Sequence, residues 1–311
     1  MTTPFRIGTR ASALALWQAN WVKSQLEKTY KGLAVELVQI KTTGDKILNV
    51  PLSEVGGKGL FTKEIDEALL DGRVDAAVHS MKDVPFQLPT GILFGAVPER
   101  EDPRDALISN GRTLDDLPPA ARIGTSSLRR QVQLRHAFPS IRISTLRGNV
   151  DTRLKKLSDG EFDGIILALA GLRRLGRESV VSQILDEALM LPAIGQGALG
   201  IACREQDATT RERLSSLDHE PTHLAVTAER GLLAALEGSC KVPIAGHARL
   251  ENGRIVLKGL VANLAGTVVV TDELTGEASK ARELGIALGK ELIRRGAGDI
   301  LAEIAQHDAK R

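Results

Sequence analysis

Two adjacent arginines follow a run of helix-capping residues in the segment Thr125-Ser126-Ser127-Leu128-Arg129-Arg130. Because Thr and Ser are common caps, a helix should begin there with free N–H groups. That helix end carries partial positive charge, so cations in its first turn are unfavourable unless an anion lies beside them. A bound anion would accept hydrogen bonds from the amides, hydroxyls and guanidiniums together. The alternative is a solvated basic helix face. Arg10, just before the cap of a similar segment, favours anion binding.

Further arginines fall where strands end or helices begin: Arg147, Arg153 and Arg174. In doubly wound sheets, ligands bind at the carboxyl ends of the strands. Arginines on such edges of two domains would face each other across a cleft, and guanidinium groups bind carboxylates through paired hydrogen bonds. The pattern predicts a polyanionic ligand, although each of these arginines, taken singly, is more often a surface residue.

An aspartate follows a buried strand in the segment His79-Ser80-Met81-Lys82-Asp83. A carboxylate at this position accepts hydrogen bonds from a ligand N–H and stabilises a developing cation by proximity. Lys82 would help keep it ionised. The alternative for Asp83 is a turn residue before Pro85. His79, next to an apolar run, is better interpreted as a packed core residue than as a base.

The chain has two cysteines, too few for a disulfide framework or a zinc site. Cys240 follows Gly238, a residue typical of the position just beyond a helix end, which places the thiol on a loop. Lys241 would favour its thiolate, so Cys240 is a candidate reactive residue. Cys203 lies in an apolar strand and is interpreted as a buried thiol. No metal site is expected, and a reducing cytoplasm fits best.

Composition excludes several classes of protein. A chain of 311 residues suits two or three domains, and 42% hydrophobic with 26% charged residues is typical of globular proteins. Aromatic residues make up only 3%, and the net charge is +2, which argues against a nucleic-acid partner. No apolar run reaches the roughly 18–20 residues of a membrane span. The N-terminus lacks the apolar core of a signal peptide.

An internal echo divides the first part of the chain. Ile7–Ser12 and Ile123–Ser127 each begin a strand–turn–helix, and Gly72–Ala76 and Gly160–Gly164 each lead into an apolar strand. Two pairs of similar segments in the same order predict two α/β domains of similar build. The alternative is that the strand–turn–helix signals are similar by chance. The expected elements of the first are strands at 5–9, 35–40 and 74–78, helices from Ser12 and over 61–70, and a long loop over 42–59.

The last part of the chain has a different pattern. A helix over 222–236 precedes short strands at 245–250, 255–261 and 268–273, with a turn at Glu251-Asn252-Gly253, and a long helix over 279–295 follows. The segments 97–104 and 191–197 are candidate crossings between the first two domains. We therefore predict domains over 1–98 with 194–218 (α/β), 99–193 (α/β) and 219–311 (α+β).

Taken together, these segments resemble the porphobilinogen deaminase (hydroxymethylbilane synthase) family over nearly the whole chain. The matching motifs are Gly8–Ser12, Thr42–Asp45, Gly56–Phe61, Ala77–Asp83, Gly124–Ser127, Arg147–Asn149, Gly195–Ala198 and the Cys240 loop, in the expected order. The resemblance implies two lobes similar to those of periplasmic binding proteins plus a third domain, and a cytoplasmic monomer. It also implies a dipyrromethane cofactor joined to Cys240 by a thioether, on which four porphobilinogen molecules are condensed with loss of ammonia.

The resemblance also implies residue roles. Asp83 would be catalytic, holding pyrrole N–H groups and stabilising the azafulvene cation. Cofactor carboxylates would bind Ser80, Lys82, Thr125, Ser127, Arg129, Arg130 and Arg153. Substrate or growing chain would bind Arg10, Ser12, Gln18, Lys58, Arg147 and Arg174. Three positions depart from the family pattern: Ser239 replaces a usual glycine, Gly231 an alanine and Ala202 a glutamate.

A non-enzymatic, two-lobed protein that binds an anion is the main alternative. It gives no role to Cys240 or to the third domain. The missing signal peptide also counts against a periplasmic version of it.

Overall fold

The computed structural model describes residues 4–46, 59–237 and 242–309. Its first sheet has the strand order β2-β1-β3-β10-β4. β1 is parallel to β2 and β3, whereas β10 is antiparallel to β3 and β4. The strands are β1 (Phe5–Thr9), β2 (Val35–Gln39), β3 (Ala76–Ser80), β4 (Ile92–Ala96) and β10 (Leu199–Arg204); the helices are α1 (Ala13–Thr29), α2 (Thr43–Lys46), α3 (Lys63–Leu70) and α7 (Ala208–Ser215).

The second sheet repeats this build, with the order β7-β6-β8-β5-β9 and β5 antiparallel to β8 and β9. Its strands are β5 (Asp105–Ile108), β6 (Arg122–Gly124), β7 (Arg142–Ser144), β8 (Gly164–Ala168) and β9 (Gln183–Ile184); its helices are α4 (Leu128–Ala137), α5 (Val150–Ser158) and α6 (Leu169–Arg174). An equivalent hydrogen bond occurs in both units: Arg6 N donates to the Asp75 carboxylate at 2.8 Å, and Arg122 N donates to the Asp163 carboxylate at 2.7 Å. The echo in the sequence is therefore a repeated fold, and the predicted pair of α/β units is confirmed.

Two chain segments connect these sheets, one between β4 and β5 and one between β9 and β10. They touch each other, since Glu101 N donates to Gly197 O at 3.3 Å. Gly197 has φ +86°, and a Cβ there would run into the carbonyl of Glu101. Only glycine allows this close crossing. The predicted crossings at 97–104 and 191–197 are confirmed.

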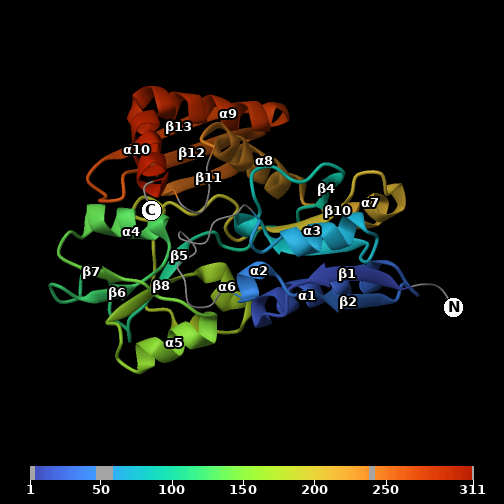
Figure 1. Ribbon diagram of the computed structural model, residues 1–311, viewed down its shortest axis with the longest axis horizontal. Coiled ribbons are helices and arrows are strands. Elements are labelled where there is room, and N and C mark those ends of the chain that lie inside the picture. Colours follow the sequence, from blue (N-terminus) through green and yellow to red (C-terminus); the bar gives the residue numbers. More distant parts are fainter. Residues whose placement is uncertain (1–3, 47–58, 238–241, 310–311) are drawn as a thin grey trace.

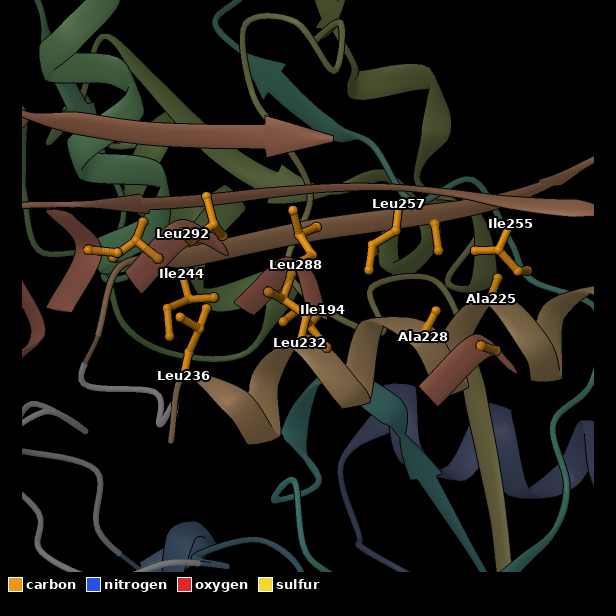
Figure 2. Packing of buried hydrophobic residues seen from close by; sticks show 14 of the residues in the cluster. Ile194, Ala225, Ala228, Leu232, Leu236, Ile244, Ile255, Leu257, Leu288 and Leu292 are labelled. Carbon is orange, nitrogen blue, oxygen red and sulfur yellow. The ribbon is translucent and has the colours of Figure 1, made fainter. Parts of the chain in front are cut away.

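The third sheet, β11 (Ile244–Glu251), β12 (Arg254–Ala262) and β13 (Val269–Glu277), is an antiparallel meander. Asn252 and Gly253 both have positive φ, as a tight hairpin turn between β11 and β12 requires. Helices α8 (Glu220–Ala235) and α9 (Ala281–Leu292) pack on it, and Figure 2 shows Leu232, Leu257 and Leu288 meeting in this core. Figure 1 shows the three units: the first in blue to teal with a later segment in gold, the second in green, and the third in orange to red.

Several predicted boundaries were wrong. Part of the expected loop is the helical turn α2, and residues 47–58 of that loop lie outside the described residues. β3 begins two residues later than expected, at Ala76. The predicted helix over 279–295 is α9, which a π-helical segment with Gly296 at φ 109° joins to a further helix, α10 (Gly298–Ala309). Short 3-10 turns occur at Met81–Asp83, Glu178–Val180 and Ala278–Lys280. Among the described helices, none has the length and apolarity needed to cross a membrane.

Candidate active site

Asp83 stands at the carboxyl end of the central strand β3. The strand ends at Ser80, and residues Met81–Asp83 form a 3-10 turn. Met81 N donates to Ala198 O at 3.0 Å, which ties the turn to the neighbouring chain before β10. Met81 is buried beneath the turn, while the Asp83 side chain is exposed. The carboxylate therefore projects from the sheet edge at which ligands of such folds bind.

A pocket beside this turn brings five predicted site residues together. It is lined by Arg10, Ser12, Gln18, Ser80 and Asp83, together with Phe61 and neighbouring residues. Gln18 Nε2 donates to Ser80 Oγ at 2.9 Å, so α1 and β3 are joined at the pocket wall. Ser12 is the N-cap of α1, as predicted, and accepts from Ala15 N at 3.3 Å.

Arg10 already has a carboxylate partner in this pocket. Its Nη2 contacts Asp45 Oδ1 at 2.5 Å, and its guanidinium lies 4.2 Å from the centre of the Phe61 ring. Burial tends to raise the pKa of Asp45, but hydrogen bonds from Arg10 and Thr42 outweigh this and hold the pKa below its usual value. A ligand carboxylate would share Arg10 with Asp45.

Arg129 and Arg130 lie buried in the first turn of α4 and pair with Asp105 of β5. Arg129 Nη1 donates to Asp105 Oδ2 at 2.7 Å, and Arg130 Nη2 to Oδ1 at 2.7 Å. Burial alone would raise the pKa of Asp105, yet the two guanidiniums lower it well below its usual value. The sequence predicted a bound anion beside these arginines, and the anion in the structure is a carboxylate of the chain itself.

Arg147 and Arg153 have no carboxylate partner: within the described part of the chain, neither forms an ion pair. Arg147 Nε is buried with no hydrogen-bond partner there, and Arg153 Nε donates to Gly148 O at 2.8 Å. Burial, Arg130 and Arg147 lower the pKa of Arg153 to about 10, while Asp83 raises it. Asp83 of the first unit is thus within electrostatic reach of α5 in the second.

Lys82 is influenced by the same charged groups, although it is exposed to solvent. Partial desolvation by the surrounding protein, with Arg130 and Arg129, lowers the pKa of Lys82 to about 8, against the opposing effect of Asp83 and Asp105. Gln196 links this lysine to the second unit: its Oε1 lies 3.4 Å from Lys82 Nζ, and its Nε2 donates to Asp105 Oδ1 at 2.9 Å.

The remaining predicted residues lie around this cluster. Thr125 is buried, and its Oγ1 accepts from Ser127 N at 3.2 Å. Ser127 is the N-cap of α4 but makes no side-chain capping bond. Arg174 donates to Gly197 O at 2.6 Å, lies 5.9 Å from the Trp17 ring centre, and has its pKa lowered to about 10 by burial.

Cys240 and Lys58 lie outside the described residues. His79 and Cys203 are buried, as predicted, and burial raises the pKa of the Cys203 thiol to about 11. Sequence reasoning missed Asp105 and Gln196. The available signals were weak: an acidic residue opening an apolar strand and an amide between two glycines.

Comparison with known proteins identifies the family. The model of the porphobilinogen deaminase dipyrromethane cofactor binding domain matches residues 5–212, and that of the porphobilinogen deaminase C-terminal domain matches 223–294. Curated proteins named porphobilinogen deaminase are 55% identical in Geobacter metallireducens and 54% in Geobacter sulfurreducens, each over 98% of this chain and 96% of theirs. A third, from Syntrophobacter fumaroxidans, is 54% identical over 96% of this chain and 97% of its own.

Solved structures match more distantly. An arginine-specific periplasmic binding protein of Salmonella typhimurium is 14% identical, with a TM-score of 0.38 over 70% of this chain and 92% of its own. A probable extracellular amino-acid-binding protein of Bacillus subtilis is 10% identical, with a TM-score of 0.42 over 70% of this chain and 90% of its own. The family assignment rests on the sequence matches. The chain belongs to the porphobilinogen deaminase family: it is a transferase that makes hydroxymethylbilane from porphobilinogen for tetrapyrrole biosynthesis, with a dipyrromethane cofactor.

Proposed function

We propose that Asp83 is the catalytic residue of this synthase and that substrate condenses stepwise, four molecules in all, on a primer attached to Cys240. One observation carries the proposal: Asp83 lines the pocket of Arg10, Ser12 and Gln18 and also acts electrostatically on Lys82 and Arg153. A single carboxylate therefore lines the pocket and interacts with the cationic cluster. Catalysis by such a group requires this shared position, because charge must be stabilised where two reactants meet.

The donor set of the cationic cluster fits a polycarboxylate cofactor. The Nε atoms of Arg129 and Arg147 are buried and have no hydrogen-bond partner among the described residues, so each can donate a hydrogen bond to a bound anion. The residues that would hold cofactor carboxylates are Ser80, Lys82, Thr125, Ser127, Arg129, Arg130 and Arg153, with the thioether at Cys240. When bound, the cofactor supplies the pyrrole carbon to which the first substrate unit is joined.

The chain's own side chains perform the remaining work. Arg10, Ser12, Gln18, Arg147 and Arg174 would orient substrate carboxylates, and Lys58 would close over them. Asp83 accepts hydrogen bonds from the substrate pyrrole N–H. It also stabilises the positive charge that develops when the carbon–nitrogen bond of the aminomethyl group breaks and ammonia leaves. Neutralising the acetate and propionate of every added unit requires cations that form no ion pair within the protein, and Arg147 and Arg153 form none among the described residues.

We further infer that the domains run over 1–98 with 194–218, 99–193 and 219–311. The three sheets and the gap between the two family matches, after residue 212 and before residue 223, support these boundaries. The two crossing segments would let the first two domains move apart as the product lengthens. We propose that the enzyme acts as a monomer in the cytoplasm, which sedimentation and cell fractionation would test.

Intact mass measurement tests the tethered primer. Wild-type protein should be heavier than its sequence by two linked pyrrole units, and Cys240→Ala should lack that increment. Cys203→Ala, which removes the other thiol, should retain it. Wild-type protein at the bare sequence mass, even after incubation with porphobilinogen, would contradict attachment at Cys240.

A further inference from the structure

A second cavity, of about 550 Å³, lies between α8, the chain that follows Asp83, β4 and the first turn of α9. It shares no lining residue with the pocket that contains Asp83. Its volume is within the range of small-molecule sites. Helices α8 and α9, which both contribute lining residues, lie above the first sheet in the view of Figure 1.

The chemistry of the lining is amphipathic. Phe86, Leu88, Phe94 and Val226 provide apolar surface, and the guanidinium groups of Arg230 and Arg282 line it together with the ring of His223. None of the described lining residues is acidic. A cavity lined by apolar side chains and two guanidinium groups is complementary to an apolar body that carries an anionic group.

Neither guanidinium is paired with a nearby acid on or before α8 within the described residues. Asp218 Oδ1 contacts His223 Nδ1 at 2.8 Å, and Glu229 is fully buried in an ion pair with Arg100. Arg282 is exposed and forms no ion pair or hydrogen bond within the described part of the chain. Burial and the proximity of Arg282 lower the pKa of Arg230 to about 10. Two like charges therefore lie close together, an arrangement that an anion between them would stabilise.

Two glycines at the contact between α8 and α9 help to create this arrangement. At Gly231 a Cβ would run into the backbone carbonyl of Arg282, and at Gly285 into that of Ala228. The two glycines let α8 and α9 approach so closely that Arg282 lies at the rim of the cavity. The alanine expected at position 231 would push α9, and Arg282 with it, away from Arg230.

We propose that this cavity binds a small amphipathic anion, an aromatic or similarly flat apolar body with a carboxylate or sulfonate held between Arg230 and Arg282. Binding in this cavity would also affect the position of Asp83 in the active site. Arg230 Nη2 donates to the carbonyls of Pro85 and Phe86, each at 2.8 Å, just beyond Asp83. This second part rests on the proposed role of Asp83: an occupant that engages Arg230 alters these bonds and slows turnover without competing with substrate.

The binding itself is tested with anilinonaphthalene sulfonate, whose fluorescence rises in apolar sites. On the holoenzyme, Arg282→Gln and Gly231→Ala should each weaken its binding about tenfold or more, the scale of one lost charge-assisted hydrogen bond. Arg254→Gln, an exposed arginine on β12, should leave the affinity unchanged, as should Arg147→Gln in the active-site cluster. Wild-type affinity in Arg282→Gln, or a loss confined to Arg147→Gln, would overturn the proposal. Circular dichroism confirms that each variant folds.

The coupling has a separate readout. At a saturating concentration, the probe should lower kcat severalfold in the wild type, leave KM unchanged, and have no effect on Arg282→Gln. A rise in KM alone would place the probe in the substrate pocket and overturn the coupling. Because probe fluorescence does not depend on turnover, failure of the cavity proposal and failure of the proposed role of Asp83 are distinguishable.

Discussion

Asp105 accepts two hydrogen bonds from Arg130, from Nε at 3.0 Å and from Nη2 at 2.7 Å, in a fully buried ion pair that Arg129 completes. The three side chains fix the start of α4 against β5. This geometry holds both guanidiniums in place before any ligand arrives. The cost of desolvating the two arginines is offset by their shared carboxylate.

Replacing that carboxylate should therefore destabilise the protein. Asp105→Asn leaves two buried cations without a counter-charge, and we expect a loss of about 3–5 kcal/mol in the free energy of unfolding. Urea denaturation measures it. Asp159→Asn is the matched control, because its pair with Lys155 is exposed to solvent and should contribute little to stability. A loss at Asp105 no larger than that of the control would refute the structural role of the pair.

Asp83→Asn should slow the reaction without abolishing substrate binding. The amide keeps the size of the side chain but removes the negative charge that stabilises the developing cation, so kcat should fall by roughly 10²–10³ with KM changed little. Steady-state kinetics measures both constants. Asp71→Asn, an exposed residue of the same unit, should behave as the wild type. Unchanged kcat in Asp83→Asn would remove Asp83 from the mechanism.

Arg147→Gln should stall elongation after the first additions. Each added unit brings two more carboxylates, and Arg147 is one of the cations without an internal ion pair in the described structure. Mass spectrometry of the enzyme during turnover should show intermediates with few added units accumulating. Arg142→Gln, an exposed arginine on β7, should give the wild-type distribution. Equal distributions in both variants would count against a role for Arg147 in elongation.

His79 should make stability depend on pH. Burial and the charge of Arg10 lower the pKa of His79 to about 4, below the roughly 6.5 of an unfolded chain. Between these values the unfolded state binds a proton that the folded state does not, so stability falls as pH drops from about 6.5 to 4. Linkage gives roughly 3 kcal/mol for this difference of about 2.5 pKa units. Denaturation midpoints at several pH values, compared with His79→Gln, measure the effect. A parallel pH dependence in that variant would show that His79 is not responsible.

Local patterns in the sequence determined much of the fold of this protein. The strand–turn–helix echo predicted two similar α/β units, Asn252-Gly253 predicted the hairpin, and the apolar surroundings of His79 and Cys203 predicted their burial. These features depend on residues a few positions apart, over which periodicity and turn preferences act. The ordered motifs from Gly8 to the Cys240 loop predicted the family, which the sequence matches confirm.

Only the tertiary structure decided which charges meet. Nothing local to Arg129 indicates Asp105, which is 24 residues earlier, or the amide of Gln196, which reaches the same carboxylate across 91 residues. The close approach of α8 and α9 at Gly231 likewise depends on how two helices pack, not on either sequence alone. Ion pairs and cavities are set by the three-dimensional packing of distant segments, because electrostatic and steric interactions follow distance in space and not separation along the chain.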